Sequence, residues 1–202
     1  MKKAMVVAFG LVFLLAGVVV AAEEVKTEEV KADDSGKLKK GDRMELIKFD
    51  KGEICGDGEA TLSKEKPEKG KMYCAKITIP AGKGLSSWLL TGTSGILKGK
   101  RGNWNNYDTV NVKYINTLEA PIKMGVMIGD QQSIDKWNHN YVSKQIVLQP
   151  GENVLSLDIS GLVCVNDRAL DLTNVRNLGL TGGPKVETET VLYIQSIYLE
   201  KE

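Results

Sequence analysis

The chain has 202 residues, and its 27 lysines and arginines nearly balance its 26 aspartates and glutamates, for a formal net charge of +1. It has no extended basic stripe, which argues against a nucleic-acid partner and against attachment to an anionic membrane surface. Its three cysteines show no C-x-x-C spacing and it has a single histidine, so the usual zinc-site patterns are absent. We expect no cofactor.

The first 22 residues have the pattern of a secretory signal peptide. A charged start, Lys2-Lys3, precedes an apolar run over residues 4–20 and small residues up to Ala22. We expect cleavage near Ala22, and therefore a secreted or periplasmic protein with no stable membrane insertion after cleavage. The alternative is that the run stays in place as a membrane anchor, because it is just long enough to cross a bilayer.

Residues 23–43, EEVKTEEVKADDSGKLKKGDR, are mostly charged. Such a segment cannot bury enough apolar surface to offset its ordering entropy, which predicts a flexible spacer. A partner-binding tail is the alternative. The remaining residues, 44–202, are long enough for one domain with a core of its own.

Alternation of apolar and polar residues dominates this domain. Glycine and proline turns separate the alternating runs, which lie at residues 73–79, 122–128, 146–148 and 155–159. The last run, VLYIQSIYLE at 191–200, is apolar on both faces, which predicts a strand covered on both sides. The best helical candidate is a single turn at 171–174, with Asp171 as its cap. The pattern predicts an all-β fold, a two-sheet antiparallel β-sandwich.

Four stretches, in order, resemble the galactose-binding-like jelly-roll domains that occur as carbohydrate-binding modules beside glycoside hydrolases. They are KGKMYCAKITIPAG (69–82), NWNNYDTVNVKYINTLEAPIKMGVMIGD (103–130), VLQPGENVLSLDISGL (147–162), and LDLTNVRNLGL (170–180) followed by VLYIQSIYLE. The resemblance implies a jelly roll over residues 44–202. It also implies a structural role for the second stretch. Trp104 would cover the sandwich edge, Tyr107 would place its hydroxyl on backbone, Asp108 would cap its own turn, and Tyr114 would be core.

One position departs from the resembled pattern. The closing strand of these domains often carries an aspartate that helps bind a structural calcium, where this chain has Gln195. We therefore predict weak or no calcium binding, with Asp50 as the one side chain to nominate, since calcium needs oxygen ligands from several segments. A disulfide between Cys55 and Cys74, which flank a predicted hairpin, is left open.

The chain lacks the common sequence motifs of catalytic sites. The chain has no Gly-x-Ser-x-Gly elbow, no phosphate-cradling glycine loop, and only His139 as a histidine. We predict that the protein is not an enzyme.

The segment GDQQSIDKWNHNYVSK, residues 129–144, fits a sugar site best. An aromatic ring offers a flat apolar face to a pyranose, and amides or charged groups read its hydroxyls. The predicted ligand-binding residues are Asp130, Trp137, Asn138, His139, Asn140 and Tyr141 from this segment, with Trp88 and Arg168 from elsewhere. As alternatives, Trp137 plugs the end of the sandwich, Trp88 belongs to the core, and Arg168 is a solvated surface residue.

These features together predict an exported, non-catalytic domain that binds a glycan or cell-surface polysaccharide. The alternative is a structural or interaction protein of the cell envelope, built on the same scaffold, with a protein partner or envelope polymer. A small polysaccharide hydrolase or lyase is the third hypothesis, and the absence of a catalytic constellation counts against it.

Overall fold

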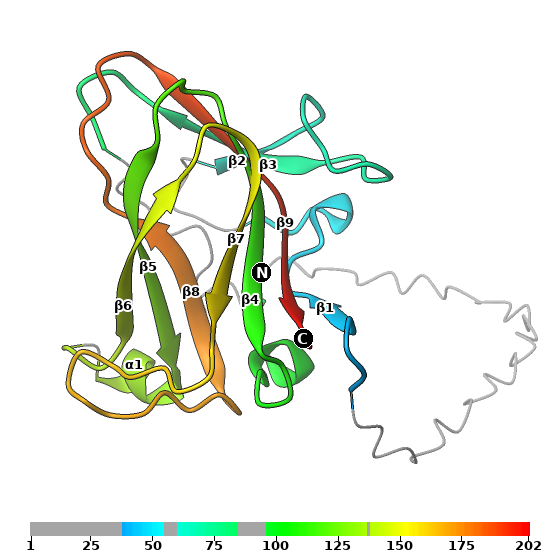
Figure 1. The fold of residues 1–202 in the computed structure, drawn as a ribbon, viewed down its shortest axis with the longest axis vertical. Coiled ribbons are helices and arrows are strands. Elements are labelled where there is room, and N and C mark those ends of the chain that lie inside the picture. Colours follow the sequence, from blue (N-terminus) through cyan, green and yellow to red (C-terminus); the bar gives the residue numbers. More distant parts are fainter. Residues whose placement is uncertain (1–37, 55–59, 85–95, 137) are drawn as a thin grey trace, which may run out of the picture. The chain divides into compact units, whose positions relative to one another are not determined.

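The computed structural model describes residues 38–54, 60–84, 96–136 and 138–202 (Figure 1). The chain divides into two compact units, Met1–Gly36 and Lys37–Glu202, and the described residues belong to the second. Within them, no helix has the length and apolar character needed to cross a bilayer. Cys55, Trp88 and Trp137 lie outside the described residues.

Two antiparallel sheets make up the fold (Figure 1). The larger has the strand order β2-β3-β9-β4-β7, and β1 also pairs with β9; the smaller has the order β6-β5-β8. The strands are β1 (Arg43–Glu45), β2 (Ala60–Ser63), β3 (Cys74–Ile79), β4 (Thr109–Asn116), β5 (Ile122–Asp130), β6 (Val142–Leu148), β7 (Gly151–Asp158), β8 (Val175–Thr181) and β9 (Thr190–Glu200). The short helical elements are η1 (Phe49–Lys51), η3 (Gly99–Gly102) and α1 (Gln131–Asp135). The predicted two-sheet antiparallel β-sandwich is confirmed.

The core lies between the sheets and follows the alternation in the sequence. One continuous cluster of buried side chains joins the inward residues of β5 to those of β4 and β9: Ile122, Met124, Val126 and Ile128; Val110, Val112 and Tyr114; Leu192, Ile194, Ile197 and Leu199. Burying each aliphatic side chain of this kind contributes about 1.5–3 kcal/mol. Tyr114 is core as predicted, and its hydroxyl accepts a hydrogen bond from the backbone N–H of Gln149 at 2.8 Å.

The Trp-x-x-Tyr-Asp stretch has a structural role, but Asp108 acts differently from the prediction. Trp104 is fully buried and its indole N–H donates to the carbonyl of Arg101 at 2.9 Å. The Asp108 carboxylate accepts from Lys201 Nζ at 2.7 Å and from the backbone N–H of Glu202 at 2.8 Å, so it ties down the C-terminus instead of capping its own turn. The reason is that β4 starts beside the end of the antiparallel strand β9, which brings those donors within reach.

The predicted turn at 171–174 forms, but it is not helical. The backbone N–H of Asn174 donates to the carbonyl of Asp171 at 3.1 Å, and Asp171 Oδ1 accepts from the backbone N–H and the hydroxyl of Thr173. Among the described residues, the α-helix is α1, and a reciprocal capping box between Asp130 and Ser133 starts it. Five residues are too few to show a helical period in the sequence.

A bulge interrupts β9 at Gln195. Lys113 pairs with Ser196 and the next residue, Tyr114, pairs with Ile194, so Gln195 is an extra residue in the strand. Because Ile194 and Ile197 point into the core, the bulge turns Gln195 and Ser196 together toward the outer face of the sheet. Every residue of β9 is buried or half-buried, which confirms the prediction of a strand covered on both sides.

Candidate functional site

Three of the residues predicted to bind ligand meet at the carboxyl end of β5. Arg168 Nη1 and Nη2 donate to Asp130 Oδ2 and Oδ1 at 2.6 and 3.0 Å. Arg168 Nε donates to Asn140 Oδ1 at 2.7 Å, and the amide N–H of Asn140 donates to the carbonyl of Gln132. Sequence analysis selected these residues, and the fold brings them together.

Their hydrogen-bonding groups are used inside the protein. The other two N–H groups of Arg168 donate to the carbonyls of Ala169 and Asn140. Asp130 is fully buried and also accepts from Ser133 and from the backbone N–H of Asp171. Burial by itself would raise the pKa of Asp130, but its hydrogen bonds to Arg168, Asp171 and Ser133 hold that pKa below its usual value. The network fastens α1 to the loop at 162–171.

The other predicted residues of this region lie nearer to solvent. Asn138 and His139 are exposed, and His139 has a left-handed backbone, with φ of 58°. The carbonyls of His139 and Tyr141 accept from the backbone of Asn166 and Val165. Ligand contacts by Asn138, His139 and Tyr141 stay predictions, as do those of Trp137 and Trp88.

A different polar depression lies on the outer face of the larger sheet; we call it the outer-sheet groove. It has two neighbouring hollows. The first, of about 280 Å³, is lined by Glu45, Lys48, Phe49, Asp50, Lys51, Lys71, Tyr73 and Gln195. The second, of about 220 Å³, is lined by Arg43, Glu45, Glu68, Lys71, Ser196 and Tyr198. Each is slightly smaller than the roughly 300–1,000 Å³ of small-molecule pockets.

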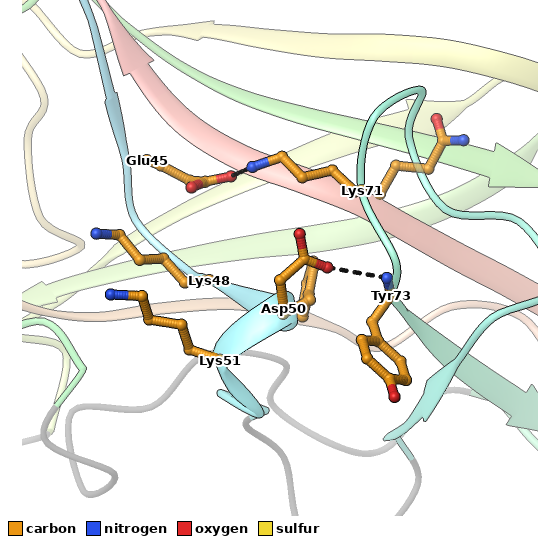
Figure 2. Close-up of a pocket in the computed structure, with 8 residues that line it drawn as sticks. Glu45, Lys48, Asp50, Lys51, Lys71 and Tyr73 are labelled. Atoms are coloured by element: carbon orange, nitrogen blue, oxygen red, sulfur yellow. Dashed lines mark hydrogen bonds and ion pairs between the residues drawn. The ribbon is translucent and has the colours of Figure 1, made fainter.

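Strand pairing and one carboxylate hold the walls of the groove in place. The register of β1 with β9 sets Glu45 opposite Tyr198. Asp50, on η1, accepts from the backbone N–H groups of Met72 and Tyr73 at 2.9 and 3.0 Å, which joins η1 to the start of β3 (Figure 2). Asp50, our nominee for calcium, therefore already has a structural role.

An ion pair borders both hollows. Lys71 Nζ lies 2.6 Å from Glu45 Oε1, and both residues line each hollow (Figure 2). The hydrogen bond to Glu45 is the main cause of a raised pKa for Lys71, which keeps it charged. In the second hollow, the guanidinium of Arg43 stands 4.6 Å from the ring centroid of Tyr198.

The floor of the groove carries two unsatisfied oxygens. Among the described residues, Gln195 Oε1 and Ser196 Oγ are the buried side-chain oxygens that have no hydrogen-bond partner. Gln195 Nε2 donates to the carbonyl of Lys66 at 3.2 Å, which fixes the orientation of the amide. An unpaired buried polar group costs about 1–3 kcal/mol. Gln195 lines the first hollow and Ser196 the second, so both unpartnered oxygens belong to side chains of the groove.

The groove thus offers amide, hydroxyl and charged groups beside tyrosine rings. No group of three or more histidine, cysteine, aspartate or glutamate residues within the described ranges could hold a metal ion. The sequence-based search passed over the groove because its polar residues are scattered between residues 43 and 198. The available signal was the pair of polar residues, Gln195 and Ser196, in the middle of an otherwise apolar strand.

No family model and no curated protein matches the chain. Among solved structures, the carbohydrate-binding module CtCBM11 superposes with a TM-score of 0.51 and 9% identity, over 74% of this chain and 88% of that one. An exo-β-agarase gives a TM-score of 0.51 and 11% identity, over 74% of this chain and 23% of the agarase. The agarase AgWH50C gives a TM-score of 0.51 and 12% identity, over 81% of this chain and 25% of the agarase. At these identities the likeness concerns the fold, and the chain has the jelly-roll fold of carbohydrate-binding modules.

Proposed function

We propose that this protein is an exported, non-catalytic domain that binds carbohydrate in the outer-sheet groove. The observation that carries the proposal is the pair of buried, unpartnered oxygens at the floor, Gln195 Oε1 and Ser196 Oγ. A fold keeps such groups unpaired at a cost of about 1–3 kcal/mol each, and a ligand that supplies hydrogen bonds offsets that cost.

The chemistry of the groove suits a sugar. A pyranose offers hydroxyls that both donate and accept, which matches the acceptor on Gln195 and the hydroxyl of Ser196. Tyr73 and Tyr198 add apolar ring surface to the two hollows, as C–H faces of sugars require. The likeness of the fold to CtCBM11 points to the same class of ligand.

Export and the lack of catalysis are parts of the same proposal. The signal-peptide pattern over residues 1–22 supports export. Glycoside hydrolysis needs a pair of carboxyl groups as acid and as base or nucleophile. In the groove Glu45 and Glu68 form ion pairs with lysines, and Asp50 accepts from two backbone N–H groups, which supports binding without catalysis.

Affinity electrophoresis in gels containing soluble polysaccharides, backed by a glycan array, tests the proposal. We expect at least one glycan to retard the protein. Ser196→Ala should weaken binding about fivefold, since a hydrogen bond contributes about 1 kcal/mol. Ser143→Ala, an exposed serine on β6, is the matched control and should bind as the parent does. A blank array, or equal binding by parent and Ser196→Ala, contradicts the proposal. A blank array favours the alternative, an envelope protein with a protein partner.

A further inference from the structure

Charge in the first hollow of the outer-sheet groove is unbalanced. Its two acidic side chains are already engaged: Glu45 pairs with Lys71, and Asp50 accepts from two backbone N–H groups. Lys48 and Lys51 have no carboxylate within 4.0 Å among the described residues. Figure 2 shows the two ammonium groups extending in the same direction from the segment of η1. The hollow therefore presents two cations that form no ion pair with any residue in the described part of the chain.

Glu53, an acid outside the hollow, does not form an ion pair with either lysine. Glu53 feels the charge of Lys48, but its carboxylate binds the guanidinium of Arg101 at 2.8 and 3.1 Å. Glu53 Oε2 also accepts from the backbone N–H of Lys48, not from its ammonium group. The ammonium group of Lys48 therefore has no ion pair with Glu53.

The same hollow holds an acceptor that needs a donor. Gln195 Oε1 is buried and unpartnered, and its amide is fixed by the bond to Lys66. A simple anion would satisfy Lys48 and Lys51 but could give Gln195 no hydrogen bond. A ligand that carries both an anionic group and hydroxyls satisfies all three residues.

We infer that the outer-sheet groove selects an anionic glycan, whose carboxylates or sulfate esters bind Lys48 and Lys51 while a further unit of the same chain lies over the part of the groove lined by Gln195. The inference rests on the proposed carbohydrate-binding function and adds the class of sugar. Lysine is a point charge without a planar fork, so the two kinds of anionic group share this recognition chemistry.

Matched polysaccharide pairs test the inference: polygalacturonate against its methyl ester, and dextran sulfate against dextran. In each pair the backbone is kept and the charge is removed. We expect the protein to bind at least one charged member more tightly than its neutral counterpart. The preference should weaken as sodium chloride is raised, because exposed charge interactions are screened within about 8 Å at physiological ionic strength. The two pairs show separately whether carboxylate or sulfate is the ligand.

A charge-matched pair of variants locates the interaction. Lys48→Gln/Lys51→Gln should lower affinity for the charged glycan about tenfold, the sum of two exposed charge contacts. Lys123→Gln/Lys144→Gln removes the same charge from exposed positions on β5 and β6 and should bind as the parent does. An equal loss of affinity in both double variants would mean that the polyanion is attracted by the general positive charge of the surface, and it would overturn the inference. If the neutral polysaccharides bind as tightly as the charged ones, the inference of an anionic ligand is wrong but the proposed carbohydrate binding stands. If no glycan binds, both the inference and the proposed function are wrong.

Discussion

The guanidinium group of Arg168 binds the carboxylate of Asp130 through two hydrogen bonds, of 2.6 and 3.0 Å, although 38 residues separate the two in the chain. The side chain of Asp130 is 1% exposed and that of Arg168 is 23% exposed. The pair differs from a surface salt bridge, because the buried carboxylate of Asp130 cannot recover its hydration if Arg168 is removed. The pair fastens the end of β5 and the loop at 162–171 to each other.

Loss of Arg168 should therefore destabilise the domain strongly. Arg168→Met leaves the Asp130 carboxylate buried without its counter-ion, for which we expect a cost of about 3–5 kcal/mol in the free energy of unfolding. Arg43→Met is the contrasting variant, because the Arg43–Glu200 pair is exposed and should contribute at most about 1 kcal/mol. Urea denaturation of both variants measures the difference. Equal costs in the two would show that the Asp130–Arg168 pair acts as an ordinary surface pair.

Asp130 should also make the domain sensitive to acid. Its pKa in the folded protein lies below the usual value of about 3.9, so the stabilisation it gives is complete above that pH and is lost as the pH falls through the folded pKa. Asp130→Asn should be less stable than the parent at pH 7, and the gap should narrow below about pH 4. Thermal unfolding from pH 7 to pH 2.5 checks this. A gap that stays constant over the whole range would contradict it.

Ser196→Ala and Ser133→Ala should have opposite effects on stability. Ser196 Oγ is buried and unpartnered, so its removal should leave the melting temperature unchanged or raise it. Ser133 Oγ is equally buried but donates to the carbonyl of Asn140 and accepts from the backbone N–H of Asp130, so its loss should cost about 1–3 kcal/mol. Differential scanning calorimetry compares the two. A clear destabilisation by Ser196→Ala would show that its hydroxyl has an internal partner.

Much of the fold could be predicted because its signal is local. Alternation along residues 122–128 and 110–114 reports which side chains face the core, and it requires no knowledge of the strand partners. The double-sided apolar character of residues 191–200 likewise indicated a central strand, and β9 lies between β3 and β4.

The candidate site could not be predicted because its signals are not local. The bulge at Gln195 depends on the register of β9 against β4, which sets Lys113 opposite Ser196. Likewise, Asp130 looked available at the end of its strand, since nothing in its neighbourhood showed that Arg168 would neutralise it. Polar residues chosen by type and position alone can be structural or functional, and only their three-dimensional partners distinguish the two.

The thiols should be free and slow to react. Cys74 Sγ donates to the carbonyl of Ser63 at 3.5 Å, and burial raises the pKa of both Cys74 and Cys164. We expect three titratable thiols in unfolded, unreduced protein, and no rapidly reacting thiol in native Cys55→Ser protein. Titration with a chromogenic disulfide measures both. A single thiol in the unfolded protein would establish one disulfide and contradict the prediction, and the pairing would then be read from a peptide map.

The last prediction separates the outer-sheet groove from the loop around Trp137. Tyr198→Leu keeps an apolar side chain on β9 but removes the ring that lines the second hollow. A ligand that packs on this ring should lose about 1 kcal/mol, or about fivefold in affinity. Trp137→Ala should then bind glycan as the parent does. Calorimetric titration with a glycan that binds the parent decides between the sites: full affinity in Tyr198→Leu and lost binding in Trp137→Ala would place the sugar at the loop predicted from the sequence.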